Sequence, residues 1–252
     1  MTDSGSAHLL VLARDLTSQP DQQSTMIRVV ELAARTVDCS VADLISRDAG
    51  GGLEVTASTD IDISAATLGA ARDSDIGWPE PRSGGSPGFR LVAPPPAARH
   101  LCSTESRYAH RVFEATGFRA ELTVPVEAAD DRRQLFLRFF SVERERWRRD
   151  DAELATDFAD LAALAIDRAA LRASADNLRA GLDTSRLIGT ATGILMARHR
   201  LTNDRAFALL RYFSQDNNRK LRDVAEDVVL IGELPPGPRP ALQAARLDTA
   251  LG

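Results

Sequence analysis

The sequence has few cysteines and no long hydrophobic run. Its 252 residues include two cysteines, Cys39 and Cys102, whose spacing matches neither a disulfide framework nor a metal site. No stretch approaches the roughly 18 consecutive apolar residues of a membrane-spanning helix, so we predict no contact with a membrane. The first residues lack the basic start and the cleavage pattern of a secretory signal. We therefore expect a cytoplasmic protein.

Motifs of the common enzyme classes are also absent. The sequence contains no phosphate-binding loop ending in Gly-Lys-Ser or Gly-Lys-Thr, no Gly-x-Ser-x-Gly elbow and no His-Glu-x-x-His motif. Its four histidines, at positions 8, 100, 110 and 199, do not have the spacing of metal ligands. We expect a protein without catalytic residues, without a metal and without a cofactor.

Arginine supplies nearly all of the positive charge. Lys220 is the single lysine among 31 basic residues, as is typical of a GC-rich genome, so arginine content alone says little about nucleic-acid binding. The placement of charge is more informative. Residues 198–222 hold seven basic and two acidic residues, whereas residues 150–185 hold eight acidic and three basic ones, in a chain of net charge −5. A basic segment inside an acidic protein indicates a nucleic-acid site.

Alternating patterns in the first 149 residues predict an α+β domain. Residues 1–8 are small and polar, and we expect them to be disordered. The remaining patterns predict helices over 26–37, 60–71 and 105–116, and strands over 39–45, 53–58, 89–92, 119–126 and 134–142. This order predicts an antiparallel sheet flanked by helices over residues 9–149.

This N-terminal region resembles a GAF domain. The resemblance rests on the helix and strand at its start, on the Gly117-Phe118 turn into Leu122-Thr123-Val124-Pro125-Val126, and on the strand from Leu135 to Phe140 that leads into a long helix. It implies a sensor domain with a small-molecule ligand, although the sequence shows no ligand-binding signature. GAF domains in such proteins also serve for dimerisation alone, and the sequence leaves both roles open.

Residues 150–185 have the composition of one long helix, because proline is absent and glycine occurs only at 181. Apolar residues recur along it at heptad spacing, interrupted by Arg168: Leu161, Leu164, Leu171, Ala175, Leu178 and Leu182. This spacing predicts a dimeric coiled coil, and a single helix packed on its own domain is the alternative.

Residues 186–232 predict three short helices. The first continues from the long helix through Arg186 to His199. The second runs from about Asn203 to Asp216, and Phe207 is among the residues expected in its core. Either Thr202 or Asn203 is expected to cap the second helix through its side-chain oxygen. The third helix ends at Gly232, and a Pro-rich tail follows over residues 233–252.

This C-terminal segment resembles an ANTAR domain over about 45 residues without a gap. The matching residues are Ala191-Thr192-Gly193-Ile194-Leu195-Met196-Ala197-Arg198-His199 in the first helix, Ala206-Phe207 and Leu209-Leu210-Arg211 in the second, and Asn218-Arg219-Lys220-Leu221-Arg222-Asp223-Val224-Ala225 at the third. The resemblance implies binding to paired stem-loops in nascent messenger RNA. The bound RNA then excludes a terminator hairpin and so prevents transcription termination.

We expect nine residues of this segment to contact RNA. Basic side chains bind phosphates, whereas aromatic, imidazole and amide groups and planar guanidinium groups contact loop bases. The candidates are Thr192, Arg198, His199, Arg211, Tyr212, Asn218, Arg219, Lys220 and Arg222.

Two other functions remain open. Three short helices with a basic third helix can form a DNA-binding helix-turn-helix, although Asp223, Glu226 and Asp227 would face DNA phosphates poorly. The C-terminal helices could instead bind only protein. The leading hypothesis is a homodimer in which a GAF-like sensor gates an RNA-binding ANTAR domain through the helix over 150–185.

Overall fold

The computed structural model of the protein describes residues 11–72, 78–79, 88–92, 104–129, 133–143 and 147–236. The chain divides into two compact units, Met1–Ala173 and Ser174–Gly252. The predictions for residues 1–8, for most of the loop around residue 80 and for residues 237–252 of the tail lie outside the described residues. Among the described residues, no helix is both long enough and apolar enough to cross a membrane.

The first unit has the predicted α+β composition. Its elements after a short helix over residues 11–17 are α2 (Gln22–Val37), β1 (Val41–Asp48), β2 (Leu53–Ser58), α3 (Ile61–Arg72), β3 (Arg90–Val92), α4 (Thr104–Thr116), β4 (Ala120–Val126) and β5 (Arg133–Ser141). Helix α2 begins four residues earlier than predicted, because the Asp21 side chain accepts a hydrogen bond from the backbone N–H of Ser24 at 2.8 Å and caps it there. The short helix was not predicted.

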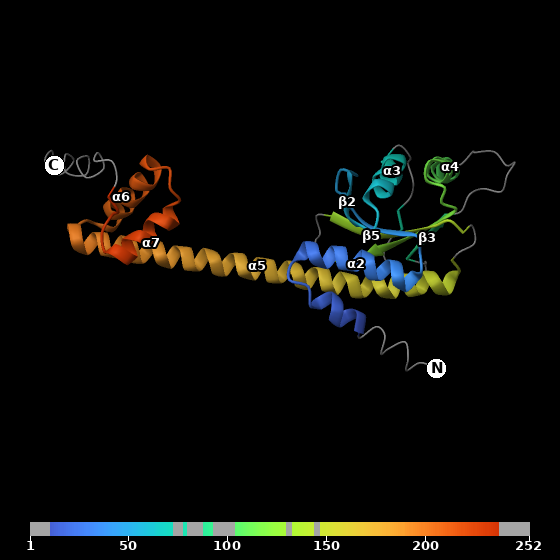
Figure 1. Ribbon diagram of the computed structural model, residues 1–252, viewed down its shortest axis with the longest axis horizontal. Coiled ribbons are helices and arrows are strands. Elements are labelled where there is room, and N and C mark those ends of the chain that lie inside the picture. The colour runs from blue at the N-terminus through green and yellow to red at the C-terminus, as the bar shows by residue number, and fades with distance from the viewer. Residues whose placement is uncertain are drawn as a thin grey trace. The chain divides into compact units, whose positions relative to one another are not determined.

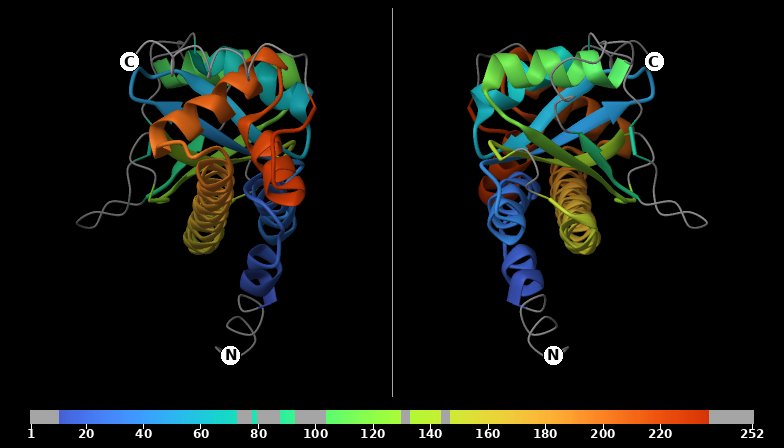
Figure 2. Two further views of the ribbon diagram at one scale, coloured as in Figure 1. Left: turned by 90° about the vertical axis from the view of Figure 1, so that its left-hand side faces the viewer. Right: turned by 90° about the vertical axis from the view of Figure 1, so that its right-hand side faces the viewer.

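The five strands form one antiparallel sheet in the order β2-β1-β5-β4-β3. Helices α3 and α4 cover one face, and α2 lies beside the first part of the long helix α5 (Arg149–His199) on the other (Figures 1 and 2). Successive strand residues point to opposite faces, so each strand feeds two separate cores. On β5, Leu137 and Phe139 enter the core under α2 and α5, and Phe136 and Phe140 enter the core under α3 and α4.

Helix α5 is continuous over 51 residues and contributes to both units. It begins where predicted, since Asp151 accepts a hydrogen bond from the backbone N–H of Arg148 at 2.8 Å and acidic residues favour the positive end of a helix. In the first unit its buried face is rich in alanine, including Ala155 and Ala162, which lets the helix lie close to the sheet. The helix therefore continues across the predicted domain boundary at residue 185, as expected from the sequence.

The second unit is the predicted three-helix bundle. The end of α5 packs with α6 (Asn203–Asp216) and α7 (Leu221–Ile231) around a small apolar core: Ala191, Leu195, Ala206, Leu210, Phe213, Val224, Ala225 and Val228. Two predictions for α6 are wrong. Thr202 is the N-cap residue but its side chain makes no capping hydrogen bond, and Asn203 donates instead to Met196 Sδ at 3.9 Å. Phe207 points outward and is 40% exposed.

Candidate nucleic-acid interface

Two tight turns set the positions of the basic residues in the second unit. Helix α5 ends with Arg200 in the left-handed region (φ 54°), and the backbone N–H of Leu201 donates to the carbonyl of Met196 at 3.2 Å. Helix α6 ends in the same way with Asn218 (φ 49°), where the N–H of Arg219 donates to the carbonyl of Ser214 at 2.9 Å. This motif is a usual helix terminus, but glycine or asparagine normally occupies the left-handed position. Arg200 is thus held in a backbone conformation that a β-carbon disfavours.

Six of the nine predicted RNA-binding residues fall into two groups at opposite ends of α6, whereas Arg211 and Tyr212 lie on α6 and Thr192 lies on α5. We define the first basic cluster as Arg198, His199, Arg200 and Arg205, around the α5–α6 turn, and the second as Asn218, Arg219, Lys220 and Arg222, around the α6–α7 turn. All eight side chains are exposed. Because α6 has 14 residues and rises about 1.5 Å per residue, the two turns lie roughly 20 Å apart. One bundle therefore presents two separate basic surfaces.

Aromatic side chains lie on α6 between these clusters. Tyr212 and Arg211 are exposed as predicted, and Phe207 stands one helical turn before Arg211. Phe207 was assigned to the core because it is large and apolar. Its neighbours Ala206, Leu210 and Phe213 already complete the i, i+4, i+7 stripe that faces the core, and this pattern places Phe207 outside it.

Arg200 and Arg205 were also missing from the predicted set, although both stand within the basic segment. Thr192, in contrast, was predicted to contact RNA but is buried. It is 4% exposed, and its hydroxyl donates to the carbonyl of Ile188 at 2.8 Å. Its side chain belongs to the bundle interior and offers RNA no surface.

Two arginines of the clusters form short ion pairs within the second unit. Arg198 Nη2 lies 2.6 Å from Glu233 Oε2, and Arg219 Nη1 lies 2.6 Å from Asp227 Oδ2. Within the described part of the chain, Arg211, Lys220 and Arg222 make no ion pair. The positive charge is therefore partly neutralised by carboxylates of α7 and the residues that follow it.

The first unit contains a row of buried polar side chains beneath α3 and α4. Asp43, Arg138, Thr123 and Arg90 are direct cross-strand neighbours on β1, β5, β4 and β3. Arg138 donates to both carboxylate oxygens of Asp43, at 2.9 and 2.6 Å, and Arg90 lies 2.9 Å from Glu121. Charge-assisted hydrogen bonds within this row join β1 to β5 and β3 to β4.

Tyr108 of α4 closes over this row. It is fully buried, and burial raises the pKa of its hydroxyl above the usual tyrosine value. Within the described residues, Arg138 Nη1 has no hydrogen-bond partner. The sheet face beneath α3 and α4 thus carries this polar row within its apolar core.

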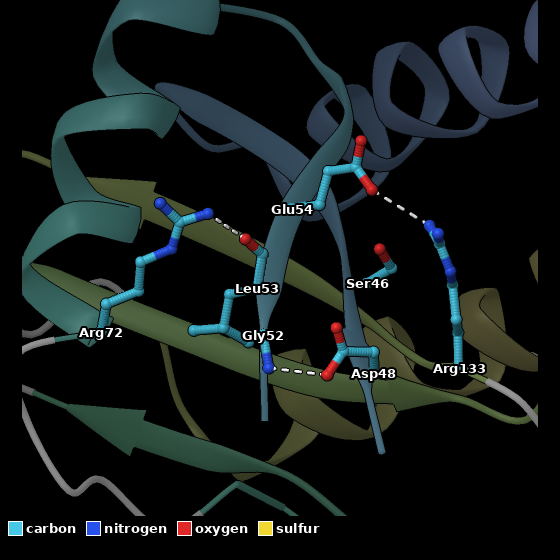
Figure 3. A pocket seen from close by; sticks show the side chains of 7 residues that line it. All are labelled: Ser46, Asp48, Gly52, Leu53, Glu54, Arg72 and Arg133. Atoms are coloured by element: carbon cyan, nitrogen blue, oxygen red, sulfur yellow. Dashed lines mark hydrogen bonds and ion pairs between the residues drawn. The ribbon is translucent and has the colours of Figure 1, made fainter. Parts of the chain in front are cut away.

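A cavity of about 470 Å³ opens at the end of the β1–β2 hairpin (Figure 3). Its lining consists of Ser46, Asp48, Gly52, Leu53, Glu54, Arg72 and Arg133. Arg72 donates to the carbonyl of Leu53, Arg133 pairs with Glu54 at 3.0 Å, and Asp48 accepts the N–H of Gly52 at 2.8 Å. Because these charges are engaged with the cavity wall, the cavity gives no sign of the ligand that a sensor would bind.

Comparison with protein families identifies residues 176–229 as an ANTAR domain. The match begins ten residues before the predicted start at 186, within α5. The comparison with curated proteins found no match.

Similar solved structures include a bacteriophytochrome and several GAF domains. A bacteriophytochrome from the photosynthetic bacterium R. palustris is 11% identical with a TM-score of 0.50, over 77% of this chain and 42% of that chain. The chain therefore spans less than half the length of that protein. The chain is also similar to the GAF domain of a putative sensor histidine kinase from Pseudomonas syringae pv. tomato, at 15% identity and a TM-score of 0.44, over 70% of this chain and 96% of that chain. A third similar structure is the GAF domain of a phosphoenolpyruvate-protein phosphotransferase from Coxiella burnetii, at 13% identity and a TM-score of 0.42, over 66% of this chain and 94% of that chain. At these identities the likeness concerns the fold alone.

Proposed function

We propose that this protein is a cytoplasmic regulator that binds paired RNA stem-loops and prevents transcription termination. The observation that carries the proposal is the pair of exposed basic clusters on an ANTAR domain, in a chain whose net charge is −5. Their separation of roughly 20 Å suits contacts to phosphates on two sides of a folded RNA rather than to one short strand. Tyr212 and Phe207 between them supply exposed rings for stacking on loop bases.

The strained backbone at Arg200 supports this function. A glycine would adopt this left-handed conformation more easily, so the arginine occupies the position at a local cost. An exposed positive charge at a turn stabilises a bound polyanion more than it stabilises the bundle itself.

The test is a salt titration of binding to a fluorescent RNA that carries two adjacent stem-loops. The triple variant Arg219→Ala, Lys220→Ala, Arg222→Ala should weaken binding and reduce the slope of log K against log salt by about 0.7–0.9 for each phosphate that is no longer bound. A matched control removes three exposed arginines of the first unit, Arg14, Arg119 and Arg148, which changes the net charge equally. Equal losses of affinity in both variants would mean that the net charge alone determines binding. That result would reject the RNA-binding site assigned to the second unit.

Binding to duplex DNA of the same length distinguishes the RNA-binding function from the main alternative, a DNA-binding helix-turn-helix protein. A helix-turn-helix protein would bind the duplex at least as tightly as the hairpin RNA. Binding to neither nucleic acid at low salt would favour a bundle that contacts only protein.

The function also requires two bundles, and we propose that α5 supplies the dimer. Leu164, Leu171 and Leu178 lie on the side of α5 opposite to the buried Ala155 and Ala162, since residues two apart differ by about 200° around a helix. Leu171 and Leu178 are each 71% exposed, and neighbouring residues over 171–183 are almost all exposed. An isolated helical stretch of this length is marginal in water, so a second copy is the natural partner for its leucines.

Arg168 interrupts this stripe of leucines. Replacing it with leucine should therefore have the opposite effect on the dimer to replacing the leucines with polar residues. Leu171→Asn with Leu178→Asn should dissociate the dimer in sedimentation experiments, whereas Arg168→Leu should strengthen it. Through bivalency, Arg168→Leu should also tighten binding to the RNA with two stem-loops and leave binding to a single stem-loop unchanged. A stronger dimer without tighter binding to the paired stem-loops would refute the coupling. In the same scheme, a signal received by the GAF-like unit would act by shifting the pairing of α5 between the copies.

A further inference from the structure

The pair between Arg198 and Glu233 is held in place from both sides. Gly232 adopts the left-handed conformation (φ 81°), and its N–H donates to the carbonyl of Val228 at 2.8 Å, which ends α7 and turns the chain toward the end of α5. On the other side of Glu233, Leu234 packs against the apolar core of the bundle. The carboxylate is therefore presented to Arg198 by a helix cap and an apolar anchor.

The pair between Arg219 and Asp227 is fixed in a similar way. The backbone of Arg219 is bonded twice to Ser214, because its N–H donates to the Ser214 carbonyl and its carbonyl accepts the Ser214 hydroxyl at 2.6 Å. Asp227 stands two helical turns along α7, on a regular helix. Each of the two basic clusters thus has one arginine whose guanidinium is already bonded to a carboxylate.

We propose that Glu233 and Asp227 occupy, in the RNA-free protein, the positions at which RNA phosphates bind Arg198 and Arg219. Carboxylate and phosphate oxygens are the two anionic acceptors that guanidinium groups bind in proteins, with similar short contacts. RNA therefore binds by exchange, in which a phosphate replaces the carboxylate on each arginine. This inference rests on the proposed RNA-binding function and assigns two phosphate positions and the groups that mask them.

The mask is weak enough to be displaced. Both pairs are partly exposed, and pairs of this kind contribute little in water, equivalent to about a two- to fivefold change in an equilibrium constant. Masking therefore lowers the affinity of each cluster for a phosphate by this factor. An RNA that reaches both clusters still binds, because its two contacts act together.

The experiment measures binding of the full-length protein to the RNA with two stem-loops, across a range of salt concentrations. The variants are Asp227→Asn, Glu233→Gln and both together. Glu226→Gln is the matched control, because Glu226 is an exposed residue of α7 and its substitution removes the same charge without releasing an arginine. Circular dichroism verifies that each variant keeps its helices.

Each masking variant should bind about two- to fivefold more tightly than the Glu226→Gln control, and the double variant should gain the product of the two. The salt slope should stay close to that of the wild type, because under exchange both arginines bind a phosphate in the wild-type complex as well. Adding Arg219→Ala to Asp227→Asn should abolish that variant's gain.

Affinities equal to that of Glu226→Gln would overturn the masking, and weaker binding would show that the carboxylates position the arginines instead. In both cases the wild-type protein still binds RNA, so the proposed function survives. If neither the wild type nor the double variant binds the RNA at low salt, the proposed function fails and the masking fails with it.

Discussion

Replacing Asp43 by asparagine should destabilise the first unit far more than any exposed charge substitution. Asp43 and Arg138 are both 0% exposed, and their side chains join the adjacent strands β1 and β5 through bonds of 2.9 and 2.6 Å. In Asp43→Asn the guanidinium of Arg138 stays buried without the carboxylate that pairs with it. Of its side-chain partners, the hydroxyl of Thr67, at 3.1 Å, is unaffected by the substitution.

The expected cost is about 3–5 kcal/mol, the range for breaking a buried ion pair by removing one partner. Removing both charges, with Asp43→Leu and Arg138→Met, should cost much less, because apolar residues of similar volume need no counter-charge. The control is Glu54→Gln, which removes one carboxylate from the exposed pair with Arg133 and should cost less than about 1 kcal/mol.

Urea unfolding followed by tryptophan fluorescence measures this unit separately. Both tryptophans of the chain, Trp78 and Trp147, belong to the first unit. The unfolding midpoint should fall in Asp43→Asn with an unchanged denaturant slope. If Asp43→Asn proves as mild as Glu54→Gln, or the double variant as severe as the single one, the pair does not carry the stability assigned to it.

Three further predictions concern other parts of the molecule. In the second unit, Leu210→Ala should cost about 2–5 kcal/mol and Phe207→Ala less than about 0.5 kcal/mol in thermal unfolding, because Leu210 is fully buried and Phe207 points outward; equal costs would contradict the described orientation. Burial raises the pKa of the Cys39 thiol to about 12. Iodoacetamide should therefore label Cys39 slowly at about pH 8 in the folded protein and rapidly in urea, as followed by mass spectrometry of the peptide that contains it. Fast labelling without urea would refute this. The hydrogen bond from Arg28 lowers the pKa of Asp15. The contribution of this pair to stability is therefore present above the ordinary aspartate pKa of about 3.9 and is lost as the pH falls below it. The thermal stabilities of the wild type and Asp15→Asn should differ near neutral pH and converge in acid, and a constant difference would argue against the pair.

Local patterns predicted most of the secondary structure correctly. The strands from Leu53 to Ser58 and the helix ending at Thr116 before Gly117 follow from side-chain periodicity and turn residues, which act within a few positions of the chain. The failures are also local in origin. Capping by Thr202 was predicted from residue type, whereas the hydrogen bond depends on a side-chain torsion that residue type does not set.

The candidate site was predicted as a segment rather than as a surface. The excess of positive charge over 198–222 is a property of composition, and it identified most of the exposed basic residues. Thr192 and Phe207 were misplaced because motif membership and apolarity do not state which side of a helix faces the bundle. The buried row of Asp43 and Arg138 had no signal in the sequence, since its members are 95 positions apart.

The sequence by itself therefore determined the order of elements, the three-helix bundle and the basic character of its turns, because helical and strand periods and charge are local properties. The tertiary structure alone decided which groups meet. Pairing of Arg198 with Glu233 across 35 positions, and the separation of the basic residues into two clusters, depend on how α6 and α7 fold back on α5. Such contacts arise from packing of whole helices around a shared core, and no short stretch of the chain contains that information.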